Sequence, residues 1–374
     1  MKKLTALLLI AVITAVVAGC ASKPTETSEA AATEAAAVSE APQETLTEDV
    51  KAQLDEALAE YHIAGIVQIT QGGGVIYQYV EGDDDNGRPL TIDSSLPIGS
   101  VSKQFCAASV MLLCDKNLLT VDDTLDQYFP DYQYGKEMTI RHLLTMSSGI
   151  PDYYPIFMSA STLGADEAEN IKQIKERLFS EEPEFESGTR YAYSNSNYLL
   201  LAEIVEQVSG VSYHDYLRKN FFEPLEMTHT GFVEEITGDH KWTSALSKTE
   251  LMNETACPGL AKGAGDIVSN AADMDLWMRA LSGGKVISSD AYLEMTKDIT
   301  ADGMEDYGYG LSPMPFDGVG HAGRIPPCFS AIDYLNTERD VYLFAASNTP
   351  QGSSYIEQIP QTLLNILFDE KESN

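Results

Sequence analysis

The stretch Pro97-Ile98-Gly99-Ser100-Val101-Ser102-Lys103-Gln104-Phe105 lies where a loop rich in Gly, Asp and Pro changes into a long apolar run. The run 105–119 has few helix breakers, so we expect a buried helix there. Ser100 then occupies the start of this helix, in a favoured capping position. Lys103 follows three residues later and shares a helix face with Ser100.

This arrangement suits an activated nucleophile. A serine hydroxyl is weak until a neighbouring base takes its proton, and burial lowers the pKa of a lysine toward that task. A helix N-terminus also supplies free N–H groups where an oxyanion would develop. The S-x-x-K pattern alone is weak evidence, because Ser282-Gly283-Gly284-Lys285 repeats it in a Gly-Gly turn with no helix to align it.

A candidate partner loop is Tyr191-Ala192-Tyr193-Ser194-Asn195, between a Ser-Gly-Thr turn and an expected helix. Tyr193 and Asn195 can point into one cleft, where a tyrosine near a lysine relays protons, partly as phenolate. The Asn195 amide can hold both the lysine and a substrate carbonyl. The plainer alternative is an ordinary turn. Tyr334-Leu335-Asn336 has the same pattern but is expected at a strand end before a turn.

Among the histidines, His321 is the strongest candidate for the site. His321-Ala322-Gly323 follows a Gly-rich strand and precedes an apolar strand, as expected of a strand that lines a cleft. His229 competes in His229-Thr230-Gly231, but it follows Pro224-Leu225 in a connector. His142 lies among apolar helix residues and is expected to be a core histidine.

The N-terminus has the features of an export signal. Residues 1–19 combine two lysines with an apolar run too short to span a bilayer, and small residues precede Cys20. This pattern predicts lipidation of Cys20, with an ordinary signal peptide or a membrane span as alternatives. Residues 20–46 are rich in Ala, Thr, Glu, Ser and Pro, which predicts a disordered acidic tether.

The formal net charge is −33, from 57 acidic and 24 basic residues. Without a basic stripe to neutralise phosphates, nucleic acid binding is disfavoured. No His, Cys, Asp or Glu spacing suggests a metal site, and no cofactor is expected. The remaining cysteines are expected to be free thiols: Cys106, Cys114, Cys257 and Cys328.

Hydrophobic periodicity predicts a folded region over 47–370. A helix over 47–61 precedes a hairpin of strands 63–70 and 75–80, and the middle of the chain is mostly helical, with helices at 140–146, 170–179 and 196–208. A helix at 271–281 leads to strands near Gly310, Gly320, 331–334 and 341–346, and one closing helix spans 353–368. We expect an α/β lobe of 47–98 and 235–370 with a helical lobe of 99–234 inserted.

With these motifs in order, the chain resembles the serine hydrolases related to class C β-lactamases and D-alanyl-D-alanine carboxypeptidases, over about residues 47–368. The motifs that carry this resemblance are Ile98-Gly99-Ser100-Val101-Ser102-Lys103, Thr139-Ile140-Arg141-His142-Leu143-Leu144 with Ser147-Ser148-Gly149, Tyr193-Ser194-Asn195, Gly263-Ala264-Gly265-Asp266-Ile267-Val268-Ser269 and His321-Ala322-Gly323. The resemblance implies an α/β fold of the β-lactamase/transpeptidase type: an antiparallel sheet flanked by helices, plus an all-helical lobe, with the site between them.

The resemblance also implies roles. Ser100 would be the acyl-forming nucleophile, with Lys103 and Tyr193 sharing the proton transfers. Asn195, His321, Gly323 and Arg324 would bind substrate; Asn195 anchors Lys103 and the substrate amide, and the backbone N–H groups of Ser100 and Arg324 form the oxyanion hole. Two departures stand out. His321 replaces the lysine usual in β-lactamases, which removes a permanent positive charge, and Pro326-Pro327 follows where relatives tend to have glycine.

These observations predict a lipid-anchored, extracytoplasmic, monomeric serine hydrolase that acts through an acyl-enzyme. Its substrate would be a small molecule or peptide with an amide or ester bond, such as a D-amino-acid peptide, cell-wall peptide or small ester. Two alternatives stay open: a class C-like β-lactamase, and a non-catalytic penicillin-recognising binding or sensor lipoprotein.

Overall fold

The computed structural model describes residues 46–372 apart from 85–86, 160–162, 234, 236–256, 298–306 and 327. Predictions for the signal peptide, Cys20, most of the tether and Pro327 therefore lie outside the described residues. The described residues belong to one compact unit. Within the described ranges, no helix combines the length and apolar character needed to cross a membrane.

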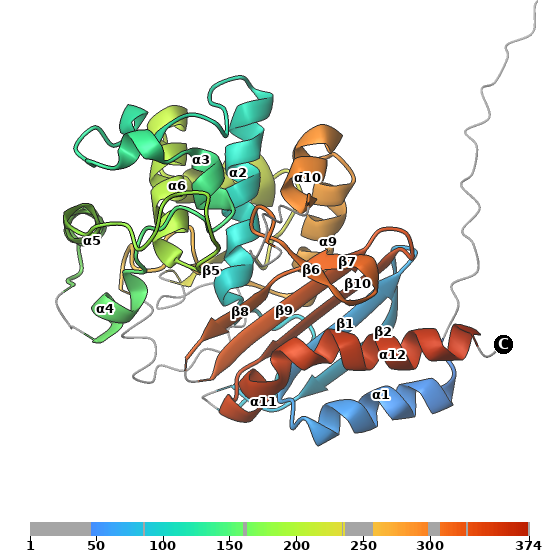
Figure 1. The fold of residues 1–374 in the computed structure, drawn as a ribbon. Helices are drawn as coiled ribbons and strands as arrows, with labels where there is room; N and C mark the ends of the chain where they lie inside the picture. Colours follow the sequence, from blue (N-terminus) through green and yellow to red (C-terminus); the bar gives the residue numbers. More distant parts are fainter. Residues whose placement is uncertain are drawn as a thin grey trace, which may run out of the picture. The chain divides into compact units, whose positions relative to one another are not determined.

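An antiparallel sheet forms the centre of this unit (Figure 1). Its strands are ordered β2-β1-β10-β9-β7-β6, and β8 also pairs with β9. The predicted hairpin is confirmed as β1 and β2, turning at Gly72 and Gly73, whose positive φ angles suit glycine. The strand bounds are β1 Gly65–Gln71, β2 Gly74–Glu81, β6 Ser312–Met314, β7 Gly318–Gly320, β8 Ala322–Ile325, β9 Phe329–Asn336 and β10 Val341–Ser347.

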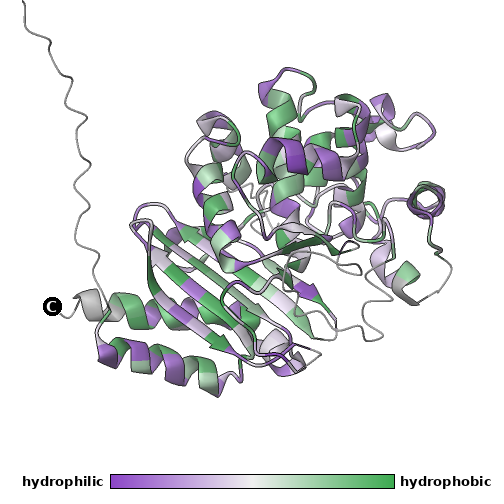
Figure 2. Ribbon diagram, turned by 180° about the vertical axis from the view of Figure 1, so that it is seen from behind, coloured by the Kyte–Doolittle hydropathy of each residue, from purple (hydrophilic) through white to green (hydrophobic). Residues whose placement is uncertain are grey.

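Helices from both chain ends cover one face of the sheet. Helix α1 (Glu48–Glu60) begins at Thr47, whose hydroxyl caps the Val50 N–H, and packs beside α12 (Ile359–Glu372). Hydrophilic and hydrophobic residues alternate along α1 (Figure 2), and its buried side chains join those of α12 in one apolar cluster. Strand alternation sends Leu343 of β10 into this cluster and Phe344 into the other core.

The expectation of one closing helix over 353–368 is wrong. Helix α11 (Pro350–Tyr355) and α12 are separated by a 3₁₀ turn, Ile356–Gln358. Pro360 then occupies the second position of α12, where its missing N–H costs no helical hydrogen bond. An uninterrupted helix would have placed this proline in the interior, where it breaks the hydrogen-bond ladder.

The larger core lies on the opposite face of the sheet, among the helices of the middle of the chain. The largely buried α2 (Lys103–Asp115) packs against α6 (Asn195–Ser209) in this core. The other helices of this part are α3 Ile140–Leu144, α4 Tyr154–Ser159, α5 Glu167–Ser180, α7 Tyr213–Leu217, α9 Ala271–Ser282 and α10 Ser289–Thr296. The antiparallel sheet flanked by helices and the helical region are as predicted.

A second, short sheet and several single turns complete the described unit. Strand β5 (Ile267–Ser269) lies between β3 (Leu96–Pro97) and β4 (Gly231–Phe232), and this sheet leads directly into the Ser100 segment. The turns are the 3₁₀ segments Gly99–Ser102, Leu125–Gln127, Gly135–Glu137 and Pro315–Asp317 and the π turn Arg218–Phe222.

Candidate active site

Ser100 lies one turn before the α2 helix. The 3₁₀ turn Gly99–Ser102 carries it, and α2 begins at Lys103, so the expectation that Ser100 caps the helix is wrong. Gly99 adopts a positive φ of 52°, a conformation that glycine tolerates. The tight turn still brings residues three apart together, and Lys103 Nζ lies 3.0 Å from Ser100 Oγ.

Lys103 is buried completely and held by three oxygen atoms. Its Nζ donates to Ser100 Oγ, to Asn195 Oδ1 at 2.9 Å and to the Ala264 carbonyl at 2.7 Å. Burial lowers the pKa of Lys103 to about 7, although the nearby Asp152 carboxylate acts in the opposite direction. A substantial neutral fraction at neutral pH suits this amine to take a proton from Ser100.

Asn195 is oriented by Asp152, a residue that the sequence reasoning missed. Asn195 is the first residue of α6, and its Nδ2 donates to Asp152 Oδ2 at 3.1 Å while its backbone N–H donates to Oδ1 at 3.1 Å. Because a carboxylate only accepts, Nδ2 of Asn195 must face Asp152, which leaves Oδ1 facing Lys103. The sequence feature that could have indicated Asp152 is its place in Gly149-Ile150-Pro151-Asp152, directly after the motif that ends in Ser147-Ser148-Gly149.

Tyr193 lies across the nucleophile from α2. Lys103 Nζ is 4.9 Å from its ring centroid, and its phenol interacts with the Ser100 hydroxyl. The residue keeps 38% of its surface exposed, yet the phenol end is buried, which raises the pKa of Tyr193 above its usual value. The phenol is therefore protonated at neutral pH, which disfavours the predicted phenolate and suits the tyrosine as a proton donor.

The backbone of strand β8 lies in close contact with the backbone of the Ser100 turn. A Cβ atom on Gly323 would lie 1.9 Å from the Ile98 carbonyl oxygen and 2.8 Å from the Ser100 nitrogen. A Cβ on Gly99 would lie 2.9 Å from the Arg324 nitrogen. The N–H groups of Ser100 and Arg324, expected to form the oxyanion hole, are thus brought together, and glycine at both positions permits the approach.

His321 is the single residue between β7 and β8, and both of its ring nitrogens already have partners. Nδ1 lies 2.6 Å from the carbonyl oxygen of Ala322, an acceptor, so Nδ1 carries the hydrogen. Nε2 then accepts from the Tyr307 hydroxyl at 3.0 Å. Burial lowers the pKa of His321 to about 3, assisted by the Lys103 charge, so the ring is neutral at neutral pH.

The Arg324 side chain lies on the other face of the sheet. Side chains alternate along a strand: Gly323 and Ile325 face the Ser100 turn and the larger core, whereas Ala322 packs against the α1/α12 cluster. Arg324 shares the face of Ala322, and its guanidinium pairs with Glu357 at 3.0 Å. Its backbone thus borders the site, while its charge is paired elsewhere.

The other candidate residues named from the sequence, Ser282, His229 and His142, make contacts outside the Ser100 site. Ser282 is the last residue of α9, and its hydroxyl donates to the Arg279 carbonyl. His229 donates its backbone N–H to Asp273 at 2.8 Å. His142, expected in the core, is partly buried and takes part in the cap of α3 with Thr139. Within the described ranges, no group of three or more His, Cys, Asp or Glu side chains is arranged to hold a metal ion.

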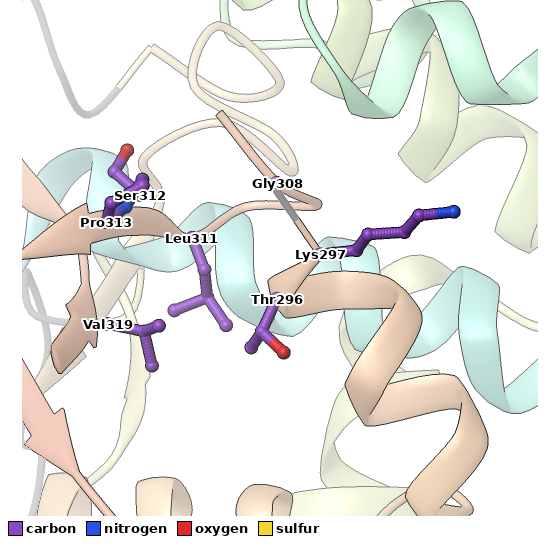
Figure 3. Close-up of a pocket in the computed structure, with 7 residues that line it drawn as sticks. All are labelled: Thr296, Lys297, Gly308, Leu311, Ser312, Pro313 and Val319. Atoms are coloured by element: carbon purple, nitrogen blue, oxygen red, sulfur yellow. The ribbon is translucent and has the colours of Figure 1, made fainter. Parts of the chain in front are cut away.

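A small hollow at the surface lies apart from Ser100. It is lined by Thr296, Lys297, Gly308, Leu311, Ser312, Pro313 and Val319, none of which belongs to the site described above. Figure 3 shows Lys297 extending away from this hollow, so its lining is mainly apolar and backbone.

The chain is similar to known proteins over most of its folded region. The Beta-lactamase family model matches residues 50–364. The chain is 29% identical over 346 residues to Penicillin-binding protein 4* of Bacillus subtilis (strain 168), covering 85% of this chain and 75% of that one. It is 27% identical over 282 residues to the D-aminopeptidase of Brucella anthropi, covering 70% of this chain but only 51% of that protein.

The fold has a similar match among solved structures. The octameric penicillin-binding protein homologue from Pyrococcus abyssi superposes with a TM-score of 0.71 at 25% identity, covering 84% of this chain and 76% of that one. Together with the family match over most of the folded region, these findings show that the chain belongs to the Beta-lactamase family, the serine hydrolases related to β-lactamases and penicillin-binding proteins.

Proposed function

We propose that the protein hydrolyses amide bonds through an acyl-enzyme on Ser100, in substrates that carry no free carboxylate beside the reacting bond. D-amino-acid amides and amino-terminal D-residues of peptides are the preferred substrates, and small neutral esters share the same chemistry. The observation that carries this proposal is the neutral, fully partnered His321.

The first half of the reaction forms the acyl-enzyme. Neutral Lys103 takes the Ser100 proton as Oγ bonds to the substrate carbonyl carbon, and the carbonyl electron pair moves onto oxygen, facing the N–H groups of Ser100 and Arg324. When the C–N bond breaks, its electron pair stays on nitrogen, which takes a proton from the Tyr193 phenol. The Lys103 ammonium then returns a proton to Tyr193.

The second half releases the acyl group. A water molecule attacks the ester carbon, and Lys103, neutral again, accepts its proton. The carbonyl re-forms as the bond to Ser100 Oγ breaks, Oγ takes a proton from the Tyr193 phenol, and the Lys103 ammonium returns a proton to Tyr193, which restores the starting state. The same groups therefore serve both halves, with Lys103 as the base and Tyr193 as the donor to the leaving group.

Charge at the site supports the choice of substrate. A carboxylate next to the reacting bond is recognised by cations, which give charge-assisted hydrogen bonds. Here His321 is neutral, the Arg324 guanidinium pairs with Glu357, and Lys103 is committed to three acceptors. The D-aminopeptidase relative, whose name denotes cleavage at an amino terminus, also supports an amide, although the chain spans about half of that protein.

Labelling and a matched pair of substrates test this proposal. Intact-mass analysis with a fluorophosphonate should give one adduct in wild type and in Ser282→Ala, and none in Ser100→Ala. D-Ala-D-Ala amide should be cleaved at least about tenfold faster in kcat/KM than free D-Ala-D-Ala at pH 7.5, because one absent charge-assisted contact amounts to about 1–2 kcal/mol.

Other outcomes would select the alternatives. Faster hydrolysis of nitrocefin than of neutral amides and p-nitrophenyl esters would identify a β-lactamase. A stable adduct with a fluorescent penicillin and no turnover of any substrate would indicate a penicillin-recognising sensor. An adduct on Ser282 in peptide mapping would overturn the site assignment.

We also propose an extracytoplasmic location, with a lipid on Cys20, a tether of residues 20–46 and a monomeric hydrolase domain facing cell-wall peptides. Small residues before Cys20 and the apolar run of 1–19 support this placement. Cys20→Ser should move the protein from the membrane fraction to the exported soluble fraction, whereas Cys257→Ser should not. Unchanged membrane association of Cys20→Ser would exclude lipid as the sole anchor.

A further inference from the structure

A buried carboxylate lies directly behind the site and takes no part in the steps above. Asp333 of β9 is completely buried, and no cation forms an ion pair with it among the described residues. Burial raises the pKa of Asp333 to about 7. A buried carboxyl group without a cation costs free energy unless hydrogen bonds compensate for its desolvation, so its contacts explain why it is placed there.

Asp333 holds both peptide groups of His321. The His321 N–H donates to Asp333 Oδ1 at 2.8 Å, and the Asp333 N–H donates to the His321 carbonyl at 3.2 Å. His321 is the break between β7 and β8, two strands that both pair with β9. At this break the carboxylate therefore accepts the backbone N–H that a strand carbonyl would accept in a continuous sheet. It thereby fixes the start of β8, the strand that carries Gly323 and Arg324.

The same carboxylate binds the helix that carries the nucleophile's base. Gln104, adjacent to Lys103 on α2, donates from Nε2 to both Asp333 oxygens, at 2.9 and 2.8 Å. The Gln104 amide cannot be reversed, because its Oε1 accepts from Trp277 Nε1 at 3.1 Å and an indole N–H only donates. Trp277 is itself held by stacking on Phe105 at 3.9 Å between ring centroids.

These contacts join the two sides of the oxyanion site. Gln104 belongs to the α2 side, with Lys103 and the Ser100 turn, and Asp333 holds the β8 side. We propose that Asp333 and Gln104 are positioning residues that set the spacing between the Ser100 turn and the Arg324 N–H. This inference rests on the proposed acyl-enzyme chemistry at Ser100, and it assigns the pair an effect on rate in addition to stability.

The hydrogen-bond pattern allows a swap experiment. Asp333→Asn, with its oxygen kept on the His321 N–H, places an amide N–H₂ against Gln104 Nε2, and Gln104→Glu places a carboxylate against Asp333, so each single change replaces the 2.8 Å hydrogen bond with a repulsive contact. In the double variant Gln104→Glu/Asp333→Asn, one oxygen of the introduced carboxylate accepts from Trp277 and the other from the introduced amide, whose oxygen still accepts the His321 N–H. The double variant thus restores the contacts to Trp277 and to the His321 N–H and one hydrogen bond between the two exchanged side chains, with the charge moved to the helix; the 2.9 Å contact to Oδ1 is not restored.

A matched control exists on α9. Asp273 is also buried, also accepts a histidine backbone N–H (that of His229, 2.8 Å) and also accepts a side-chain donor, the Thr230 hydroxyl at 2.8 Å. It contacts none of the residues assigned to the site. Asp273→Asn therefore reports what the loss of such a buried network does to stability alone.

The variants are compared by melting temperature, by kcat and KM for a neutral amide or ester, and by the second-order rate of Ser100 labelling with a fluorophosphonate. Each single variant should lower kcat and the labelling rate by about tenfold or more, with little change in KM, because oxyanion contacts strengthen in the transition state. The double variant should recover most of kcat and of the labelling rate. Asp273→Asn should lose stability while its kcat and labelling rate stay within about threefold of wild type.

Two outcomes would overturn the inference: single variants that label Ser100 as fast as Asp273→Asn, or a double variant no faster than the singles. Failure of the proposed function looks different. If wild type labels at Ser100 but cleaves no neutral amide or ester, the substrate proposal fails, while the labelling rates still decide the role of Asp333. Absence of labelling in wild type would overturn both.

Discussion

The Tyr307 hydroxyl donates to Nε2 of His321 over 3.0 Å, and the other ring nitrogen donates to the Ala322 carbonyl. His321, which stands where β-lactamases usually have a lysine, therefore has both ring nitrogens hydrogen-bonded at neutral pH, and no hydrogen is left for a substrate carboxylate. Tyr307 and Asp333 were not expected from the sequence, and together they fix both the ring and the backbone of this one residue.

His321→Lys should reverse the preference for neutral substrates. An ammonium group here offers a charge to a carboxylate, so the kcat/KM ratio of free D-Ala-D-Ala to its amide should rise by about tenfold. Tyr307→Phe should not raise the ratio, since it frees only the Nε2 lone pair, which cannot donate a hydrogen bond to a carboxylate. Tyr309→Phe, which loses contacts to Arg141 and Glu294 instead, serves as the control and should leave the ratio unchanged.

The pH dependence of the reaction should report Lys103. Since the neutral amine is the base and its pKa is about 7, kcat/KM should rise with pH through an acid limb near pH 7. Lys103→Met should lower kcat/KM by about 10²–10⁴-fold and remove this limb. A limb near pH 5 that persists in Lys103→Met would assign the base to another group.

The same lysine should make stability depend on pH. Folding lowers the pKa of Lys103 from 10.5 to about 7, so between these values the unfolded chain binds more protons than the folded one. The free energy of unfolding of wild type should therefore rise with pH over this window, relative to Lys103→Met. Urea denaturation at pH 6.5, 8 and 9.5 measures the difference, and a wild-type free energy of unfolding that falls relative to that of Lys103→Met with rising pH would contradict the burial of a charged amine.

Asp152 should affect Lys103 in two ways: its charge raises the Lys103 pKa, and its hydrogen bond orients Asn195. Removing the carboxylate removes an influence that raises the Lys103 pKa, so Asp152→Asn should shift the acid limb of kcat/KM to lower pH. It should also lower kcat, because Asn195 loses the acceptor for its Nδ2. Asp166→Asn provides the control, since Asp166 accepts a backbone N–H at the start of α5, as Asp152 accepts that of Tyr154 at the start of α4, and lies outside the site. An acid limb that stays in place would argue against electrostatic coupling.

Gly323→Ala should damage both folding and activity. The added methyl group would meet backbone atoms of Ile98 and Ser100, which cannot rotate away as a side chain can. Forcing such a contact typically costs about 1–3 kcal/mol, and the displaced β8 would carry the Arg324 N–H with it. Thermal unfolding and the fluorophosphonate labelling rate test this. Gly164→Ala, with open space around its Cβ position, should change neither.

Much of the architecture could be predicted because its causes are local. Apolar spacing and the Thr47 cap determine α1, two glycines determine the β1–β2 turn, and the spacing of Ser100 and Lys103 brings them together in any helical turn. The order of the motifs along the chain identified the family. The sequence-based errors were also local: a 3₁₀ turn at Ser100, and a break in the closing helix near Pro360.

The tertiary structure alone decided the charge states and hydrogen positions of the site residues. The low pKa of Lys103 and the neutrality of His321 come from burial, which depends on packing between distant segments. The contact of Gln104 with Asp333 joins residues 229 positions apart, and strand alternation in an assembled sheet turns the Arg324 charge toward Glu357. The sequence by itself determined which reacting groups are present, whereas only folding settled which of them carry charge and where the hydrogen atoms lie.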